Sequence, residues 1–218
     1  MLFSALIVAL RLPAQQRATG RSFRLRLPHV PVPNRRQVLC GIATFGSGIT
    51  ATSFVLALGP SMLARLLEVR SPLLAGSMTC AMFFTAAGAQ FAVRRSSVAR
   101  IFAFSYAATI LAMASLILAI HASLVSALIA SALFAGAGQG LGQLGGLTLI
   151  GLHVPAPYRA QSNAALSIGA YIPAGLLPVA TGYLTDAVGL ASGASLFALV
   201  LAIVSLAGGI WAVRQTET

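Results

Sequence analysis

Two glutamines, Gln139 and Gln143, lie inside a long apolar stretch of this sequence. Side chains four residues apart lie on the same face of a helix. An amide exposed to lipid would have no hydrogen-bond partner, so this face should turn to the protein interior or to a water-filled cavity. There the amides can bond a neighbouring helix or a polar substrate, and the sequence favours neither role over the other.

A second polar patch lies between residues 44 and 53, where hydroxyl side chains and glycines occur together. It comprises Thr44, Gly46, Ser47, Gly48, Thr50, Thr52 and Ser53. Broken or bent helices near the bilayer midplane often form transporter binding sites. Ser and Thr can equally bond carbonyls of their own helix, and we expect that use to be somewhat the more frequent.

Glycines crowd the stretch that holds the two glutamines. They are Gly136, Gly138, Gly140, Gly142, Gly145 and Gly146. Residues 140–145 spell G-x-G-x-x-G, but a dinucleotide site also needs a preceding strand and an acid about 20 residues later. No acid occurs between Glu68 and Asp186. The spacing instead predicts close helix packing through small residues four apart.

A hinge is predicted further along the chain, where Pro173 and Pro178 bracket Gly175, just after Tyr171. Proline inside a helix frees a carbonyl and bends the helix.

Charged and metal-binding groups are scarce. The chain has only three acids, no Lys lies among its 14 basic residues, and none of these charges falls in the middle of an apolar stretch. The three histidines lie at predicted loop edges, and the two cysteines read as small buried hydrophobes. We therefore expect no metal site, no cofactor and no enzyme activity, since catalysis needs convergent His, Asp or Glu groups.

The composition indicates a membrane protein. Hydrophobic residues make up 58% of the chain, charged residues 8%, and the mean hydropathy is +0.91. A spanning helix needs about 20 apolar residues. The sequence predicts an all-α, polytopic protein with six spans, at about 38–64, 72–93, 100–121, 124–152, 162–185 and 191–213.

The remaining segments are short or basic. Residues 1–10 are apolar but too short to span, and we interpret them as the tail of an incomplete transmembrane helix. Residues 11–37 form a basic loop that contains three prolines, and residues 215–218 form a short tail after the six-helix domain of residues 38–214.

Arginine distribution predicts the topology. If the 11–37 loop is cytoplasmic, that side also carries Arg94, Arg95, Arg100, Arg159 and Arg214, whereas the other side carries Arg65 and Arg70. Positive charge is retained in the cytoplasm, which predicts N-in and C-in. Because the arginines lie in gaps between apolar runs, a nucleic-acid surface is excluded. Arg without Lys in an Ala- and Gly-rich chain suggests a bacterial inner-membrane protein.

This organisation resembles the C-terminal half of the major facilitator superfamily, in which a basic loop joins two six-helix halves. The family's loop signature G-x-x-x-D-R-x-G-R-R aligns with residues 86–95, where Arg94 and Arg95 remain but Gln90 replaces the acid. Ala86 and Val93 replace the glycines. A second family string, G-x-L-x-D-x-x-G, matches Gly182, Leu184, Asp186 and Gly189.

The resemblance implies the twelve-helix transporter fold, with this chain as helices seven to twelve. It implies alternating-access transport of a small organic molecule, and an N-terminal six-helix half or a second copy as partner in the bilayer. The implied cavity residues are Ser47, Thr50, Gln139, Gln143 and Tyr171, and the implied gating residues are Gln90, Arg94, Arg95 and Asp186. Any proton-coupling carboxylate would then belong to the other half.

One alternative remains open from the sequence. The chain can be a self-contained six-helix protein, either a homodimeric carrier or a structural membrane component. It would then begin at Met1, with residues 1–10 on the membrane surface.

Overall fold

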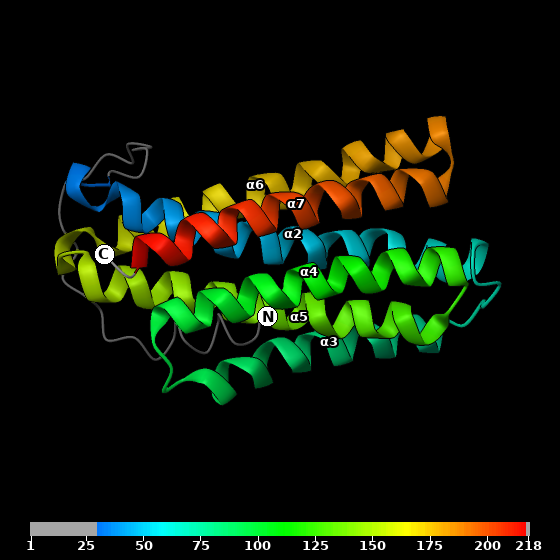
Figure 1. Ribbon diagram of the computed structural model, residues 1–218, viewed down its shortest axis with the longest axis horizontal. Coiled ribbons are helices and arrows are strands. Elements are labelled where there is room, and N and C mark those ends of the chain that lie inside the picture. The colour runs from blue at the N-terminus through cyan, green and yellow to red at the C-terminus, as the bar shows by residue number, and fades with distance from the viewer. Residues whose placement is uncertain (1–29, 217–218) are drawn as a thin grey trace, which may run out of the picture.

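The computed structural model describes residues 30–216, which fold into a bundle of long helices (Figure 1). A short 3-10 helix, η1 (Val32–Asn34), leads into the first of them. The six helices are α2 (Arg35–Arg65), α3 (Pro72–Val93), α4 (Val98–Ala122), α5 (Val125–His153), α6 (Ala156–Val188) and α7 (Leu190–Thr216). Each is long and apolar enough to cross a membrane, which confirms the predicted six-helix membrane fold.

Several helix ends differ from the predicted spans by a few residues, and two of the differences have a clear cause. The helix α6 begins six residues earlier than expected. Pro157 lies in its first turn, where a backbone N–H has no partner within the helix, so its absence in proline costs nothing. The helix α2 begins at Arg35, directly after the turn that contains Pro33, so the basic loop predicted over 11–37 gives way to helix before its end. The predicted helix tail at 1–10 and most of that loop lie outside the described residues.

Connections of one to six residues join the helices, so successive helices run antiparallel. The starts of α2, α4 and α6 and the ends of α3, α5 and α7 therefore meet at one end of the bundle (Figure 1). We call this the Arg-rich end, because among described side chains it carries Arg35, Arg36, Arg94, Arg95, Arg100 and Arg159, all exposed. The other end carries Arg65, Arg70, Glu68 and Asp186, so both described acids lie there.

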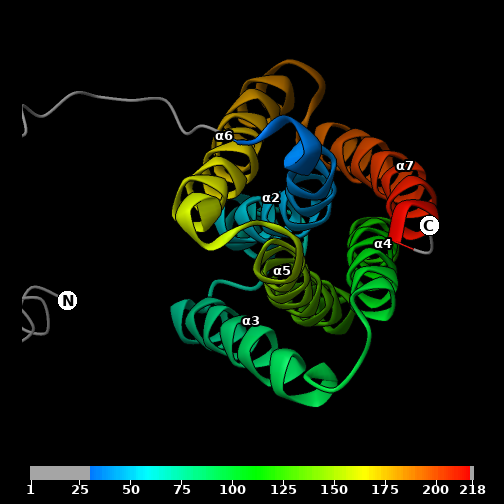
Figure 2. The ribbon, with the colours of Figure 1, turned by 90° about the vertical axis from the view of Figure 1, so that its left-hand side faces the viewer.

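The helix packing partly follows an inverted repeat of two three-helix units, although α4 packs closely on α5 whereas its counterpart α7 packs much less on α2. Looking along the helices, α2 and α5 lie in the middle, α3 and α6 to one side, and α4 and α7 to the other (Figure 2). The first unit, α2–α4, matches the second, α5–α7: α2 packs on α6 as α5 packs on α3, and α2 and α4 each pack on their counterparts α5 and α7. The counterparts in the two units run antiparallel.

Three apolar clusters hold the bundle together. The largest lies toward the end opposite the Arg-rich end, where Phe54 of α2 stacks on Phe197 of α7 with ring centroids 4.0 Å apart. The other two lie toward the Arg-rich end: one joins α2, α5 and α6 through Phe45, Ile150 and Leu166, and the other surrounds Phe102 and Tyr106 of α4. Polar groups at mid-depth, between these clusters, define the candidate site.

Candidate functional site

The glycines of α5 set which way its glutamines face. A Cβ at Gly136 or Gly140 would collide with the backbone carbonyls of Met82 or Ala86, so this face of α5 lies directly against α3. On another face, a Cβ at Gly142 would lie 2.9 Å from the Cα of Phe45, so that face lies against α2. By helical periodicity, Gln139 and Gln143 fall between these two faces. The amides therefore occupy the sector of α5 between α2 and α3.

The back of α5 is locked to α4. The Ser105 hydroxyl donates to the Gly138 carbonyl over 2.8 Å, and a Cβ at Gly145 would lie 2.6 Å from the Phe102 ring. Contacts on three sides leave α5 little freedom to rotate. The glycine string thus orients the two amides, in addition to allowing the helices to pack closely.

Gln139 is the central residue of α5, and its side chain is half-buried. Its Oε1 atom is buried and accepts no hydrogen bond from the described residues. A buried acceptor without a partner costs about 1–3 kcal/mol. A buried polar atom of this kind at mid-bundle is suited to a donor group on a bound molecule.

Gln143 lies one turn closer to the Arg-rich end and is also half-buried. Because α5 and α6 run antiparallel and Leu166 lies against Gly146, Gln143 is at about the depth of residue 169. The Phe45 ring meets the Tyr171 ring edge-on, with centroids 5.7 Å apart. Tyr171 is next to the central residue of α6 and is 53% exposed. We call Gln139, Gln143 and Tyr171 the midplane site.

The hydroxyls of α2 do not join the midplane site. Ser47 donates to the Thr44 carbonyl over 2.9 Å, a bond within its own helix. Ser47 is seven residues before Phe54 and so shares the face of α2 that packs on α7. Thr50 is 2% exposed. The structure thus buries Ser47 and Thr50 in the bundle and does not bring them to an open surface beside the amides.

Thr52 uses its hydroxyl to hold α2 against α5. Its Oγ1 atom lies 3.1 Å from both the Gly48 carbonyl of its own helix and the Ala135 carbonyl of α5. Here a threonine contributes to helix packing, which is one of the two uses the sequence allows.

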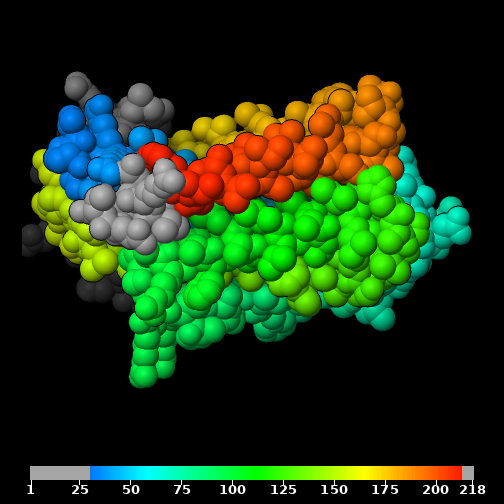
Figure 3. Space-filling view, in the orientation of Figure 1, coloured from blue at the N-terminus to red at the C-terminus, as the bar shows by residue number. Residues whose placement is uncertain are grey.

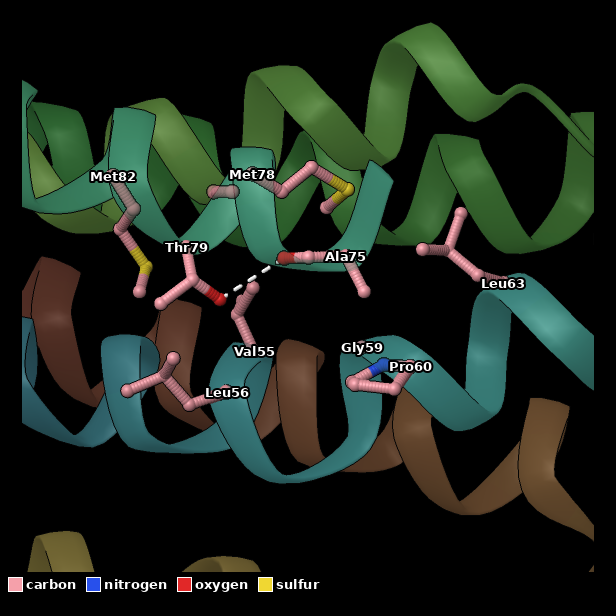
Figure 4. Close-up of a pocket in the computed structure, with 10 residues that line it drawn as sticks. Val55, Leu56, Gly59, Pro60, Leu63, Ala75, Met78, Thr79 and Met82 are labelled. Atoms are coloured by element: carbon pink, nitrogen blue, oxygen red, sulfur yellow. Dashed lines mark hydrogen bonds between the residues drawn. The ribbon is translucent and has the colours of Figure 1, made fainter. Parts of the chain in front are cut away.

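The α2–α3 sector is closed at the end opposite the Arg-rich end. Figure 4 shows the apolar side chains that meet there, with Thr79 donating to the Ala75 carbonyl over 3.1 Å. The lining residues are Val55, Leu56, Gly59, Pro60, Leu63, Ala75, Met78, Thr79, Met82 and Ala132, around a cavity of only about 10 Å³. The outer face of α3 is exposed along its whole length, and a Cβ at either Gly76 or Gly88 would meet nothing within 4 Å.

The predicted hinge lies in a continuous helix. No break interrupts α6 at Pro173, Gly175 or Pro178, and a Cβ at Gly175 would meet nothing within 4 Å. Pro178 is buried.

The predicted loop residues lie at opposite ends of the bundle. Gln90 is half-buried near the end of α3, and Arg94 and Arg95 are exposed beyond it. Asp186 is exposed at the far end, in the last turn of α6. Gly189 ends that helix with φ +88°, a left-handed conformation that favours glycine.

Two residues near the site escaped the sequence analysis. Phe45 links α5 to Tyr171, and no polar pattern marks it. Asn163 of α6 has a buried Oδ1 atom that accepts no hydrogen bond from the described residues. The signal for it was present, because Asn163, Ser167 and Tyr171 recur every four residues along one side of α6.

Within the described residues, no three His, Cys, Asp or Glu side chains come close enough to hold a metal ion. His121 contacts the Ser195 hydroxyl at 3.3 Å, between α4 and α7. Comparison of the chain with protein-family models, with curated proteins and with solved structures gave no match.

Proposed function

We propose that this chain is one half of a secondary transporter that moves a small, neutral or amphiphilic organic molecule across a bacterial inner membrane. The observation that carries the proposal is Gln139, with a buried, unpaired amide oxygen at the centre of the central helix α5. Secondary transporters bind substrate near the midplane, at the interface of repeats. An unpaired amide oxygen in that position lowers the stability of the fold, and a bound ligand would supply the missing hydrogen-bond donor.

Two further features support a transport role. The partial match to an inverted repeat of three-helix units supports it, because many carriers are built on such repeats, including the family that the sequence resembles. Apolar side chains of α2 and α3 close the amide sector at the end opposite the Arg-rich end, as one gate of an alternating-access carrier would.

The orientation we propose places the Arg-rich end in the cytoplasm. Six exposed arginines and no described acid lie at that end, against two of each at the other, which fits the positive-inside rule. N-in and C-in follow.

The partner we propose is an N-terminal six-helix half, or a second copy of this chain. Alternating access works by rocking one bundle against another around the site, so a single bundle has no opposing gate. In the described spans α2–α6, every ionisable Asp, Glu or Arg lies at a helix end rather than mid-helix. A proton-coupling carboxylate, if one is used, would come from the partner half.

The partner question is tested by the intact mass of the natively expressed protein. A species at 22.3 kDa that purifies as a dimer supports a carrier built from two copies, and a species near twice that mass supports two joined halves. A 22.3 kDa monomer without any six-helix partner would contradict the proposed mechanism.

The site is tested by a thermal-shift screen of neutral and amphiphilic compounds on the purified native protein. A compound that stabilises the wild type should fail to stabilise Gln139→Ala. The matched control is Gln161→Ala, at an exposed glutamine in the first turns of α6. Compounds that stabilise all three proteins equally, or none, would place binding away from Gln139.

A further inference from the structure

A groove lies on the side of the bundle away from the midplane site, between α4 and α7. Figure 3 shows these two helices side by side on one face of the molecule. Eight residues line it: Ala103, Tyr106, Ala107 and Ile110 from α4, and Ser205, Leu206, Gly209 and Ile210 from α7. Its volume is about 450 Å³, and its lining is almost entirely apolar.

The groove exists because the residues on its walls are small and Tyr106 turns inward. Ala103, Ala107 and Gly209 project little into it. A Cβ at Gly209 would lie 3.1 Å from Tyr106 Cγ, so the ring packs flush against the backbone of α7. Tyr106 is only 3% exposed, and its hydroxyl lies 3.2 Å from Thr44 Oγ1 of α2. These contacts fix the floor of the groove and leave its mouth open.

The size suits one hydrocarbon chain. The open space of about 450 Å³ is large enough for a stretch of acyl chain. Along α4, residues 103 to 110 span about 10 Å of the bilayer. A linear chain that lies along the helices fits this shape.

Positive charge at the Arg-rich end of the groove favours a lipid with an anionic headgroup. Arg100 lies three residues before Ala103 and seven before Ala107, so it shares their helix face one turn nearer the membrane surface. Arg100 is exposed, as are Arg94 and Arg95 at the same end, and both described acids lie at the opposite end. Basic pockets between transmembrane helices bind anionic lipid headgroups.

We propose that the α4–α7 groove binds an anionic phospholipid, with one acyl chain over Ala103, Ala107 and Gly209 and its phosphate at Arg100. The guanidinium of Arg100 donates hydrogen bonds to the phosphate oxygens, and the groove holds the acyl chain apart from the mobile lipids around the protein. This site is separate from the midplane site and does not depend on the transport proposal.

The test is lipid retention by the full chain. The protein is reconstituted in vesicles of equal parts phosphatidylglycerol and phosphatidylcholine and re-extracted, and the co-purified lipids are counted by native mass spectrometry. We expect phosphatidylglycerol to be retained preferentially, and Arg100→Gln to lower that preference about five-fold. Arg70→Gln, at the opposite end, is the matched control and should leave the preference unchanged.

A second variant tests the groove itself. Ala107→Phe, at an exposed position, should fill the groove and lower retention of both lipids without changing the stability of the fold. Equal retention of the two lipids by the wild type would overturn the proposal. So would a preference that survives Arg100→Gln, or a stable dimer in which Ala107→Phe separates the two copies, because a second copy would then be the occupant.

Discussion

The two central helices occupy equivalent places in the repeat but use their polar residues differently. In α2, Thr44, Ser47 and Thr52 all donate to backbone carbonyls, and Thr52 reaches across to α5. In α5, Gln139 keeps an acceptor that no described residue satisfies. A hydroxyl can bond its own helix, whereas the longer amide extends beyond its backbone. The two helices therefore differ in how far the backbone carbonyls around them satisfy the polar side chains that we predicted as site residues.

The largest expected effect concerns the contact that orients α5. Gly140→Ala would place a Cβ against the Ala86 carbonyl, and backbone cannot move aside as a flexible side chain can. We expect a loss of about 2–3 kcal/mol in unfolding free energy, measured by thermal unfolding in detergent. Gly151→Ala, in the same helix with nothing within 4 Å, is the control and should be neutral or slightly stabilising. Equal effects would mean that α5 is not held by α3.

The next effect has the opposite sign. Gln139→Leu removes the orphaned acceptor at similar volume, so the fold should gain about 1–2 kcal/mol while substrate binding is lost. Thermal unfolding and the compound screen, run on the same preparation, separate the two readouts. If the variant is instead destabilised, the amide has a structural partner and the contrast with α2 disappears.

In α2, the matching substitution should destabilise. Thr52→Val keeps the shape but removes the donor shared by the Gly48 and Ala135 carbonyls, and we expect a loss of about 1 kcal/mol. Compound-induced stabilisation should be unchanged relative to the wild type. A variant that unfolds normally but no longer responds to compounds would bring α2 into the binding site.

The smallest effect is expected at Ser47. Among the described residues its hydroxyl bonds the carbonyl of Thr44 in the same helix, so Ser47→Ala should change the unfolding free energy by about 0.5 kcal/mol or less. Compound binding should also be unaffected. A strong binding defect would show that the buried face of α2 opens to substrate in another state of the protein.

Much of the fold could be read from sequence because spanning helices need long apolar runs. Helix number and the shared face of Gln139 and Gln143 depend only on composition and helical periodicity, which are local. The start of α6 was missed because Pro157 and Arg159 resemble loop residues, although both are compatible with a first helical turn. Local pattern thus identifies the spans better than their ends.

The orientation of each polar face depended on contacts that sequence does not display. Ser47 and Thr50 are hydroxyl residues of the kind that can line a cavity. Packing of α2 on α7 and α6 nevertheless buries both of them. The α4–α7 groove is formed by residues about one hundred positions apart in the sequence, so no local motif indicates it. Tertiary contacts, rather than residue type, decide which polar groups stay accessible.

The one-residue turn at Gly189 has a consequence for how distant sites communicate. Gly189 has φ +88°, and its amide donates to the Thr185 carbonyl over 2.9 Å. This single residue connects α6 directly to α7. We expect a movement of α6 to be passed through this turn to α7, which forms one wall of the groove. Because allosteric coupling is reciprocal, a lipid that favours one position of α7 would then change the affinity for the proposed substrate by the same factor by which that substrate changes lipid affinity. Substrate affinity measured in vesicles with and without phosphatidylglycerol should differ, and equal affinities would show that the turn does not couple the two sites.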